Sequence, residues 1–303
     1  MKTVALLGAG AVGAYFIWGM SPYLGDDFCV IAHGERKERL ERDGLIINGV
    51  VYHPIIKTPI QARGVDLLLV ATKYDGLKTI LDDIEIIVDE HTTVISLLNG
   101  VDSEQIIAQR IGAQHMLHAM MRISAERKGN DIFFNPDITG GMFFGELLHT
   151  EPTCRVQEVL DLFAPTRVNH HFVPDIMKAL WVKYAGNVSN NLPQAIFGVG
   201  VGVFVTSDHA CHIAQHMWDE VAALAATHGI NIGPFNPAAW VERMNARFST
   251  LQDLDNGRHT EVDMFAGAVV RMSREKGLEA PYCEFAYHCI KVLEEKNDGK
   301  FEF

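Results

Sequence analysis

A glycine pattern near the start of the chain has the spacing of a phosphate-binding turn. Gly8, Gly10 and Gly13 directly follow an apolar run, and a helical pattern begins within them. The first glycine permits a tight turn, the second lets the backbone approach a pyrophosphate, and the third allows close helix packing. The alternative is a glycine turn that serves packing alone. We predict dinucleotide binding by the whole motif: Gly8, Ala9, Gly10, Ala11, Val12 and Gly13.

The residues after the second apolar run indicate which dinucleotide is bound. An acid at this strand end would bind the ribose hydroxyls of NAD, whereas a basic group accommodates the 2′-phosphate of NADP. His33 stands at this position without an acid beside it, and Arg36 follows closely after Glu35. We therefore expect His33 and Arg36 to favour NADP (NADPH), with NAD less favoured. The alternative is that Arg36 and Lys37 only begin a solvated helix.

Polar residues also follow the next two apolar runs. Lys73 comes after the run at 65–71, and Asn99 comes after the run at 93–98. Ligands of open α/β sheets bind beyond the carboxyl ends of the strands, so both residues are candidates for a binding site. Alternatively, both are ordinary turn residues.

In the second half of the chain, Lys183, Asn187 and Asn191 recur every four residues within a helical pattern. On a helix they would form one polar stripe with apolar side chains around it. One ammonium and two amides need partners once they are buried, and a polar substrate could supply them. The alternative is a partly exposed helix with an ordinary solvated lysine.

Ser249 and Glu261 are two further candidates. Thr260 and Asp263 have the spacing of a capping box, with Asp in place of the usual Glu, which predicts Glu261 in a first helical turn. There it either complements the helix dipole or accepts hydrogen bonds from substrate hydroxyls. Ser249 offers a donor to a carboxylate.

A rival site is formed by His212, His216 and Glu220, which recur every four residues on a predicted helix. Neutral imidazoles at this spacing can chelate a metal. No second paired cluster elsewhere in the sequence completes a coordination shell. We therefore interpret these residues as a solvated or packing face and predict no metal site.

The elements that must position these residues alternate in the first half of the chain. Apolar runs at 3–7, 28–32, 65–71 and 93–98 predict strands, with helical segments between most of them. Such runs are typical of a parallel sheet that helices cover on both faces. Further predicted elements are a hairpin at 44–52 around Asn48-Gly49 and strands at 116–123, 131–134 and 168–173.

The pattern becomes helical after Pro174, with few strand candidates. We predict an α/β domain, a doubly wound Rossmann sheet, at residues 1–173. An all-α domain is predicted at residues 174–303.

Composition restricts the class of protein. The net charge of −12 provides no basic excess for nucleic acid or an anionic membrane surface. The five cysteines include no C-x-x-C pair, which is typical of free thiols in a reducing compartment. The first residues show no signal-peptide pattern, and no apolar stretch is long enough for a membrane span. We expect a cytoplasmic protein.

Taken together, these motifs resemble the ketopantoate reductase (2-dehydropantoate 2-reductase) family. The resemblance covers nearly the whole chain in the expected order. It rests on the glycine motif, Asn99-Gly100, Leu180-Trp181-Val182-Lys183, Asn187, Asn191, Ser249, the run from Gly257 to Asp263, and Gly277-Leu278-Glu279-Ala280-Pro281. It implies a Rossmann domain and a helical domain similar to that of 6-phosphogluconate dehydrogenase, with the active site in the cleft between them.

The resemblance also implies the reaction, which is NADPH-dependent reduction of ketopantoate to pantoate, as in pantothenate and coenzyme A biosynthesis. Lys183 would be the general acid and Glu261 would bind the substrate hydroxyl. Lys73 and Asn99 would lie at the boundary of cofactor and substrate, and the residues holding the substrate would be Asn187, Asn191 and Ser249. The alternatives are reduction of another branched 2-keto acid, or a non-catalytic dinucleotide sensor. The long C-terminal helices could support a homodimer.

The chain departs from the family pattern at two places. After Asn191 the family usually continues Pro-Leu-Thr, whereas this chain reads Leu192-Pro193-Gln194. The usual arginine after the second strand is His33. The first departure leaves the keto acid open, and the second weakens the preference for NADP.

Overall fold

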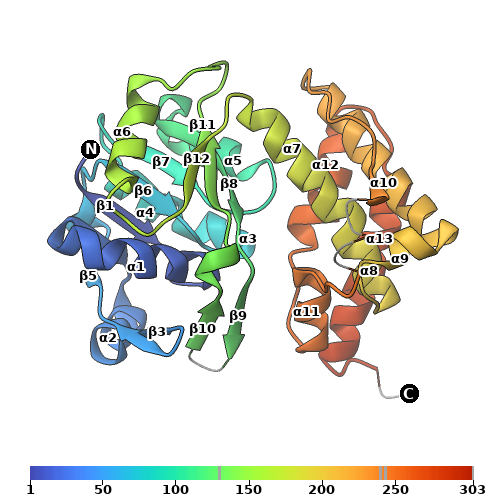
Figure 1. The fold of residues 1–303 in the computed structure, drawn as a ribbon, viewed down its shortest axis with the longest axis horizontal. Coiled ribbons are helices and arrows are strands. Elements are labelled where there is room, and N and C mark those ends of the chain that lie inside the picture. Colours follow the sequence, from blue (N-terminus) through green and yellow to red (C-terminus); the bar gives the residue numbers. More distant parts are fainter. Residues whose placement is uncertain (129–130, 239–240, 242–243, 302–303) are drawn as a thin grey trace. The chain divides into compact units, whose positions relative to one another are not determined.

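The computed structural model describes residues 1–128, 131–238, 241 and 244–301. The chain divides into two compact units, Met1–Met177 and Lys178–Phe303. The first unit contains strands and helices, and the described part of the second contains helices and loops (Figure 1). The predicted combination of an α/β region followed by an all-α region is confirmed.

The main sheet of the first unit has the strand order β12-β11-β8-β7-β6-β1-β2-β5. Six neighbouring strands, from β5 to β8, are parallel, while β11 runs antiparallel to β8. In chain order the six parallel strands follow the sequence 3-2-1-4-5-6, which is that of a Rossmann sheet. The strands are β1 (Val4–Leu7), β2 (Phe28–Ile31), β5 (Ile55–Lys57), β6 (Leu67–Val70), β7 (Thr93–Ser96), β8 (Met116–Arg122), β11 (Gly141–Gly145) and β12 (His170–Phe172).

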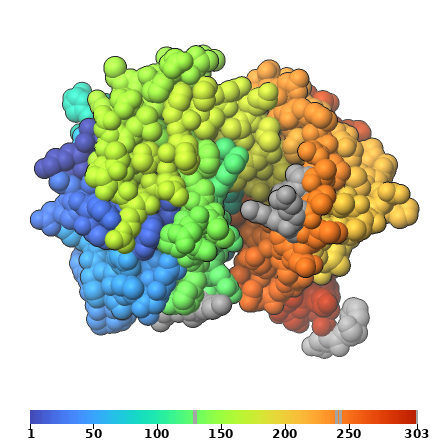
Figure 2. Space-filling model, in the orientation of Figure 1, coloured from blue at the N-terminus to red at the C-terminus, as the bar shows by residue number. Residues whose placement is uncertain are grey.

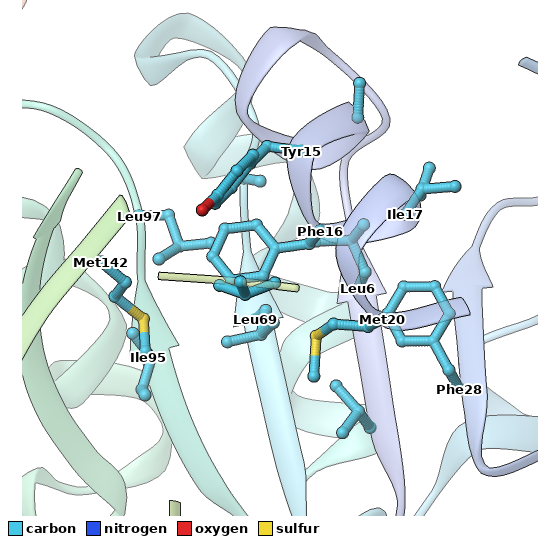
Figure 3. Packing of buried hydrophobic residues seen from close by; sticks show 14 of the residues in the cluster. Leu6, Tyr15, Phe16, Ile17, Met20, Phe28, Leu69, Ile95, Leu97 and Met142 are labelled. Atoms are coloured by element: carbon cyan, nitrogen blue, oxygen red, sulfur yellow. The ribbon is translucent and has the colours of Figure 1, made fainter. Parts of the chain in front are cut away.

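Helices cover both faces of this sheet because its central strands are apolar on both sides. Every residue of β1, β2, β6 and β7 is buried. Helices α1 (Ala11–Leu24) and α6 (Cys154–Phe163) pack on one face, and α4 (Leu81–Ile87) and α5 (Ser103–Ile111) on the other. Figure 3 shows Phe16 and Met20 of α1 lying over the strands that carry Leu6 and Phe28. In Figure 2 the yellow-green atoms around α6 form part of the outer surface of the first unit.

A second, smaller sheet has the order β4-β3-β10-β9. The hairpin of β3 (Leu45–Ile47) and β4 (Val50–Tyr52) confirms the prediction from Asn48-Gly49. Both turn residues have positive φ angles, 50° and 77°, as a tight hairpin turn requires. The other two strands are β9 (Ala125–Lys128) and β10 (Asp131–Phe134).

Most predicted strands are confirmed within two residues at either end. Three observed strands were not predicted: β5, β9 and β11. Strand β5 has only three residues, β9 is mostly charged, and β11 begins and ends with glycine. Each obtains its hydrogen bonds from a neighbouring strand. The remaining helices of the first unit include α2 (Gly34–Asp43) and α3 (Tyr74–Leu77).

Helix α7 (Ile176–Gly186) leads into the second unit and continues as a π-helical segment, η6 (Asn187–Asn191). A second π-helical segment, η8 (Asp263–Gly267), precedes α12. The helices that complete the unit are α8 (Leu192–Phe197), α9 (Val203–Thr206), α10 (Asp208–Ala226), α11 (Ser249–Asp255), α12 (Ala268–Glu275) and α13 (Pro281–Asn297). Among the described helices, none has the length and apolar character needed to cross a bilayer.

Candidate functional site

The three glycines of the N-terminal motif have different structural tasks. Gly8 has a φ angle of 110°, and a Cβ atom there would lie 2.5 Å from the Ala71 carbonyl oxygen. A Cβ at Gly13 would lie 2.0 Å from the carbonyl oxygen of Gly8. Packing therefore requires Gly8 and Gly13. A Cβ at Gly10 would have no neighbour within 4 Å, so this glycine leaves open space beside the backbone.

The open space at Gly10 lies at the N-terminus of α1, which suits an anion. No side chain caps this helix end, and its first turn contains no acidic residue. The first backbone N–H groups and the helix dipole together favour a phosphate. Close to Gly8, the buried Thr72 hydroxyl has no hydrogen-bond partner among the described residues. These features fit the pyrophosphate of a dinucleotide.

The residues expected to choose the cofactor follow β2. His33 is exposed, and its Nε2 lies 3.4 Å from Oδ2 of Asp83 in α4. The tertiary fold thus places an acid beside His33, which has no acidic residue directly next to it in the sequence. The pKa of Arg36 is lowered by partial desolvation and by the like charges of Arg39 and Arg127. Positive and negative groups therefore both lie in this region.

On the other side of β1, three successive parallel strands have polar residues at or beyond their carboxyl ends. Lys73 follows β6 and is exposed, and Asn99 follows β7 and is half-buried. Arg122 is the last residue of β8 and is exposed. The carboxyl ends of parallel strands share one edge, so Lys73 and Asn99 follow neighbouring strands at the same edge. Arg122 was missed because the sequence placed it inside a predicted strand at 116–123.

Hydrogen bonds connect the loops that carry Lys73 and Asn99. The Tyr74 hydroxyl, next to Lys73, donates to Oδ2 of Asp102 at 2.6 Å. The hydroxyls of Ser96 and Ser103, on either side of the Asn99 loop, lie 2.8 Å apart. These bonds restrict the position of the Asn99 loop from both of its ends.

The Asn99 loop is also anchored to a buried carboxyl group. Ser103 donates to Oε2 of Glu104 at 2.9 Å, and the side chain of Glu104 is buried within the first unit. Burial raises the pKa of Glu104 to about 7, although its hydrogen bonds oppose the shift. The group thus changes charge near neutral pH.

In the second unit, the predicted polar stripe lies where α7 changes into η6. Lys183 is in the last turn of α7, Asn187 begins η6 and Asn191 ends it. An α-helix turns about 100° per residue, so residues spaced by four drift around its axis. A π turn contains more residues and turns less per residue, which offsets this drift. Lys183 and Asn187 are half-buried, while Asn191 is buried.

Tyr184 links the Lys183 helix to the segment that follows Glu261. Its buried hydroxyl shares a hydrogen bond between the carbonyl oxygens of Met264 and Phe265, at 3.0 Å and 2.8 Å. Both acceptors belong to η8, which begins two residues after Glu261. The Glu261 carbonyl oxygen in turn accepts from Phe265 N–H at 3.0 Å. The two segments with the expected catalytic residues are therefore held together within one unit.

The predicted capping box between Thr260 and Asp263 is wrong, because Thr260 has a different partner. The Thr260 N–H and hydroxyl both donate to Oε1 of Glu294 in α13, each at 2.7 Å. Asp263 instead accepts from the Tyr287 hydroxyl at 2.9 Å and from Lys291 Nζ at 2.6 Å. A distant carboxylate has replaced the local one, and Glu261 stands just before a π segment rather than in an α-helical first turn.

Gln194, where the chain departs from the family pattern, holds the segment before Ser249. Its Nε2 donates to the Ala246 carbonyl oxygen, and its Oε1 accepts from Phe248 N–H, both at 2.8 Å. Ser249 is exposed and begins α11 directly after this clamp. Gln194 is fully buried, and its two hydrogen bonds fix the backbone that leads into Ser249.

The His212, His216 and Glu220 series has a structural explanation. Both carboxylate oxygens of Glu220 accept from the first N–H groups of α13, those of Tyr282 at 2.7 Å and Cys283 at 2.8 Å. The His216 ring stacks on that of Tyr282, with centroids 4.6 Å apart. Glu220 thus caps helix α13, and both oxygens of its carboxylate accept hydrogen bonds there.

We predict that Glu104→Gln changes the pH dependence of stability. A carboxyl whose pKa is raised on folding from 4.5 to about 7 makes the parent lose stability as pH rises across that window. The loss is on the order of 3 kcal/mol. Unfolding free energies of both proteins between pH 4 and 8 test this. Their difference should grow up to about pH 7 in favour of the variant, and a constant difference would contradict the assignment.

We predict that Tyr184→Phe loosens the second unit while the ring stays in place. The loss of one buried hydrogen bond costs about 1–3 kcal/mol, seen as a lower thermal midpoint. The KM for a keto acid should rise while dinucleotide binding is unchanged, since that site lies in the other unit. Tyr23→Phe, at an exposed tyrosine of the first unit, is the control. Unchanged stability and KM in the variant would contradict the role of this bond.

Comparison with known proteins agrees with these features. Residues 4–148 match the family model described as ketopantoate reductase PanE/ApbA, and residues 175–294 match the model of its C-terminal region. The 2-dehydropantoate 2-reductase of Pyrococcus horikoshii is 26% identical over 98% of this chain and 99% of its own.

Two solved structures share the fold across both units. A ternary structure of D-mandelate dehydrogenase with NADH and anilino(oxo)acetate has a TM-score of 0.81 and 23% identity, covering 98% of this chain and 99% of its own. A dimeric ketopantoate reductase from Staphylococcus aureus has a TM-score of 0.75 and 17% identity, covering 97% and 99%. The two family models together span both units, so the chain belongs to the ketopantoate reductase family.

Proposed function

We propose that this protein reduces a 2-keto acid with NADPH, and that ketopantoate, reduced to pantoate, is its substrate. The observation that carries the proposal is the link made by Tyr184, which holds the Lys183 helix against the segment that follows Glu261. Binding of a dinucleotide alone would need neither of these residues. The proposal therefore favours an enzyme over a non-catalytic dinucleotide sensor.

In this mechanism bound NADPH supplies a hydride to the keto carbon of the substrate. The Lys183 ammonium stabilises the negative charge that grows on the keto oxygen and then donates a proton to it. Lys183 is left neutral and regains a proton from water. Glu261 accepts a hydrogen bond from the substrate hydroxyl, and Asn187, Asn191 and Ser249 hold the substrate. Asn99 and Lys73 lie at the boundary between cofactor and substrate.

The residues Gly8 to Gly13 would bind the pyrophosphate, since the N-terminus of α1 has neither a side-chain cap nor an acid. We propose that Arg36 and His33 bind the 2′-phosphate of NADPH. The like charges near Arg36 support this choice, because a phosphate would relieve their mutual repulsion. NADH is the second candidate, favoured by the Asp83 carboxylate beside His33, which could bind ribose hydroxyls.

The substrate side chain is the least constrained part of the proposal. Gln194, which replaces the usual threonine of the family, supports Ser249 through its backbone neighbours. Another branched 2-keto acid therefore remains the alternative substrate, while a pantoate-forming enzyme would act in pantothenate and coenzyme A biosynthesis. All five cysteines are free thiols, which supports the cytoplasm as its compartment.

We also propose that the protein forms a homodimer through its second unit. Helix α13 leaves Phe285 68% exposed and Val292 51% exposed. Phe285 borders an apolar pocket of about 120 Å³ lined by residues of α8, α10 and α13. An apolar surface of this kind is typical of contact with another protein surface. The dimeric relative from S. aureus adds support.

We predict that Lys183→Ala lowers kcat with ketopantoate by about a hundred- to ten-thousandfold, the usual contribution of a general acid. NADPH binding, followed by fluorescence titration, should be unchanged. Lys296→Ala, at an exposed position in the last turn of α13, is the matched control. Equal turnover in Lys183→Ala and the parent would remove the proposed acid.

We predict a lower KM for NADPH than for NADH. Arg36→Ala should raise the KM for NADPH about tenfold and leave that for NADH unchanged, because a charged hydrogen bond to phosphate contributes about 1.5–3 kcal/mol. Arg42→Ala, in the last turn of the same helix, is the control, since Arg42 pairs with Asp43. The reverse order of the two KM values in the parent would assign Asp83 to the ribose of NADH instead.

A further inference from the structure

The proposed mechanism gives no strong cationic partner to the carboxylate that every 2-keto acid carries. Lys183 is engaged with the keto oxygen, and Lys73, at the boundary of cofactor and substrate, offers a single ammonium. The remaining proposed contacts are amides, a hydroxyl and a carboxylate. A carboxylate is bound most strongly by a guanidinium, which donates two parallel hydrogen bonds to it. The first unit contains an arginine suited to this task.

Arg122 ends β8 on the side of the sheet where the reacting end of a dinucleotide would lie. The adenosine side of a Rossmann site lies toward β2, so the other end of the cofactor extends over β6 and β7, toward β8. Leu117 of β8 is level with Ile95 of β7. Strand β7 ends one residue later, whereas β8 continues for five residues to Arg122. Arg122 therefore stands roughly 13 Å beyond the end of β7, at about 3.3 Å per residue.

A row of stacked side chains orders the Arg122 guanidinium. Its Cζ lies 4.6 Å from the ring centroid of Phe143 on β11. The Phe143 ring stacks in turn on His171 of β12, with centroids 4.6 Å apart and an interplanar angle of 28°. The three residues come from three adjacent strands of the sheet. A guanidinium held over an aromatic face loses part of its conformational freedom before any ligand binds.

The backbone beside Arg122 is adapted to its side chain. Gly141 is the register partner of Arg122 in β11, and Gly140 precedes it. A Cβ at Gly140 would lie 3.0 Å from the Cβ of Arg122 and 3.4 Å from the Phe143 ring. A larger residue at Gly140 would therefore crowd the stack.

The charge of Arg122 is not neutralised within the described residues, where it makes no ion pair. Arg110 and Arg155 of the first unit differ in this respect. Arg110 pairs with Asp82 and Glu85, and Arg155 pairs with Glu146. An ordered, exposed cation without a carboxylate partner, at the ligand edge of a Rossmann sheet, is suited to a substrate anion.

We infer that Arg122 binds the carboxylate of the keto acid, next to the Asn99 loop. The inference rests on the proposed function, which supplies the substrate class. Asn99 comes three residues after the end of β7 and Arg122 ends β8, so both lie beyond the paired part of two neighbouring parallel strands. Arg122 thereby distinguishes an acid from its neutral derivatives.

The test compares a 2-keto acid with its methyl ester in the full-length protein. Arg122→Gln should raise the KM for the acid by ten- to a hundredfold and leave the KM for the ester unchanged. Arg122→Lys keeps the charge without the two parallel donors and should give an intermediate KM. Arg42→Gln is the matched control, and thermal midpoints show whether each variant is folded. Equal KM values for the acid in the parent and Arg122→Gln would overturn the inference while leaving the proposed reaction intact.

A binding measurement separates this inference from the reaction itself. Oxamate carries a carboxylate next to a carbonyl and is used here as a non-reacting probe, titrated by calorimetry into the protein saturated with NADP⁺. Its affinity should fall at least tenfold in Arg122→Gln. If the parent reduces no 2-keto acid but binds oxamate through Arg122, the reaction assignment fails and the anion site stands. If the parent neither reduces a 2-keto acid nor binds oxamate, both fail.

Discussion

The hydrogen bond from Tyr184 to the carbonyl oxygens of Met264 and Phe265 is the contact on which the candidate site of the second unit depends. It joins two helical regions that are 80 residues apart in the chain. Each region contains a π segment, a rare form of helix that often occurs at functional sites. Lys183 precedes one π segment and Glu261 precedes the other. The separation of the ammonium from the carboxylate therefore depends on a buried phenol and two wide helical turns.

In the first unit, buried polar groups hold the loops that carry Lys73 and Asn99. Tyr74 and Asp102 join the loops after β6 and β7, and Ser96, Ser103 and Glu104 hold the second loop from below. A carboxyl that is neutral over part of the physiological range carries a smaller desolvation cost than a buried anion. The loop with Asn99 can thus be held firmly without a permanent buried charge beneath it.

Much of the fold could be predicted from local sequence, and the exceptions have a common physical cause. The glycine motif and the apolar runs predict β1, β2, β6 and β7 because each is buried on both faces. Strand β9 reads Ala-Glu-Arg-Lys and β11 begins and ends with glycine, so neither has a strand-like composition. They form because β10 and β8 offer them backbone partners, and such pairing overrides intrinsic preference.

The site shows the same division between local and distant information. Spacing alone predicted Lys183, Asn187 and Asn191 as one stripe, although it could not reveal the π segment that contains the two asparagines. The capping partner of Thr260 is 34 residues away, which no local pattern can indicate. Asp83, which lies beside His33, belongs to the distant helix α4. Arg122 was predicted inside a strand, and only the register of β8 with β7 shows that it lies beyond the end of β7.

The Gln194 clamp has a consequence for which substitutions the chain can accept. Its carboxamide forms hydrogen bonds with main-chain atoms, namely the oxygen of residue 246 and the nitrogen of residue 248. The Gln194 amide thus donates one hydrogen bond to the main chain and accepts one from it, as a neighbouring strand of a sheet does. Substitutions of the side chains at 246 and 248 leave these hydrogen bonds intact. At 194, only an amide of the right length can both donate one hydrogen bond and accept the other. Natural variation should therefore be unequal at the two ends of this contact.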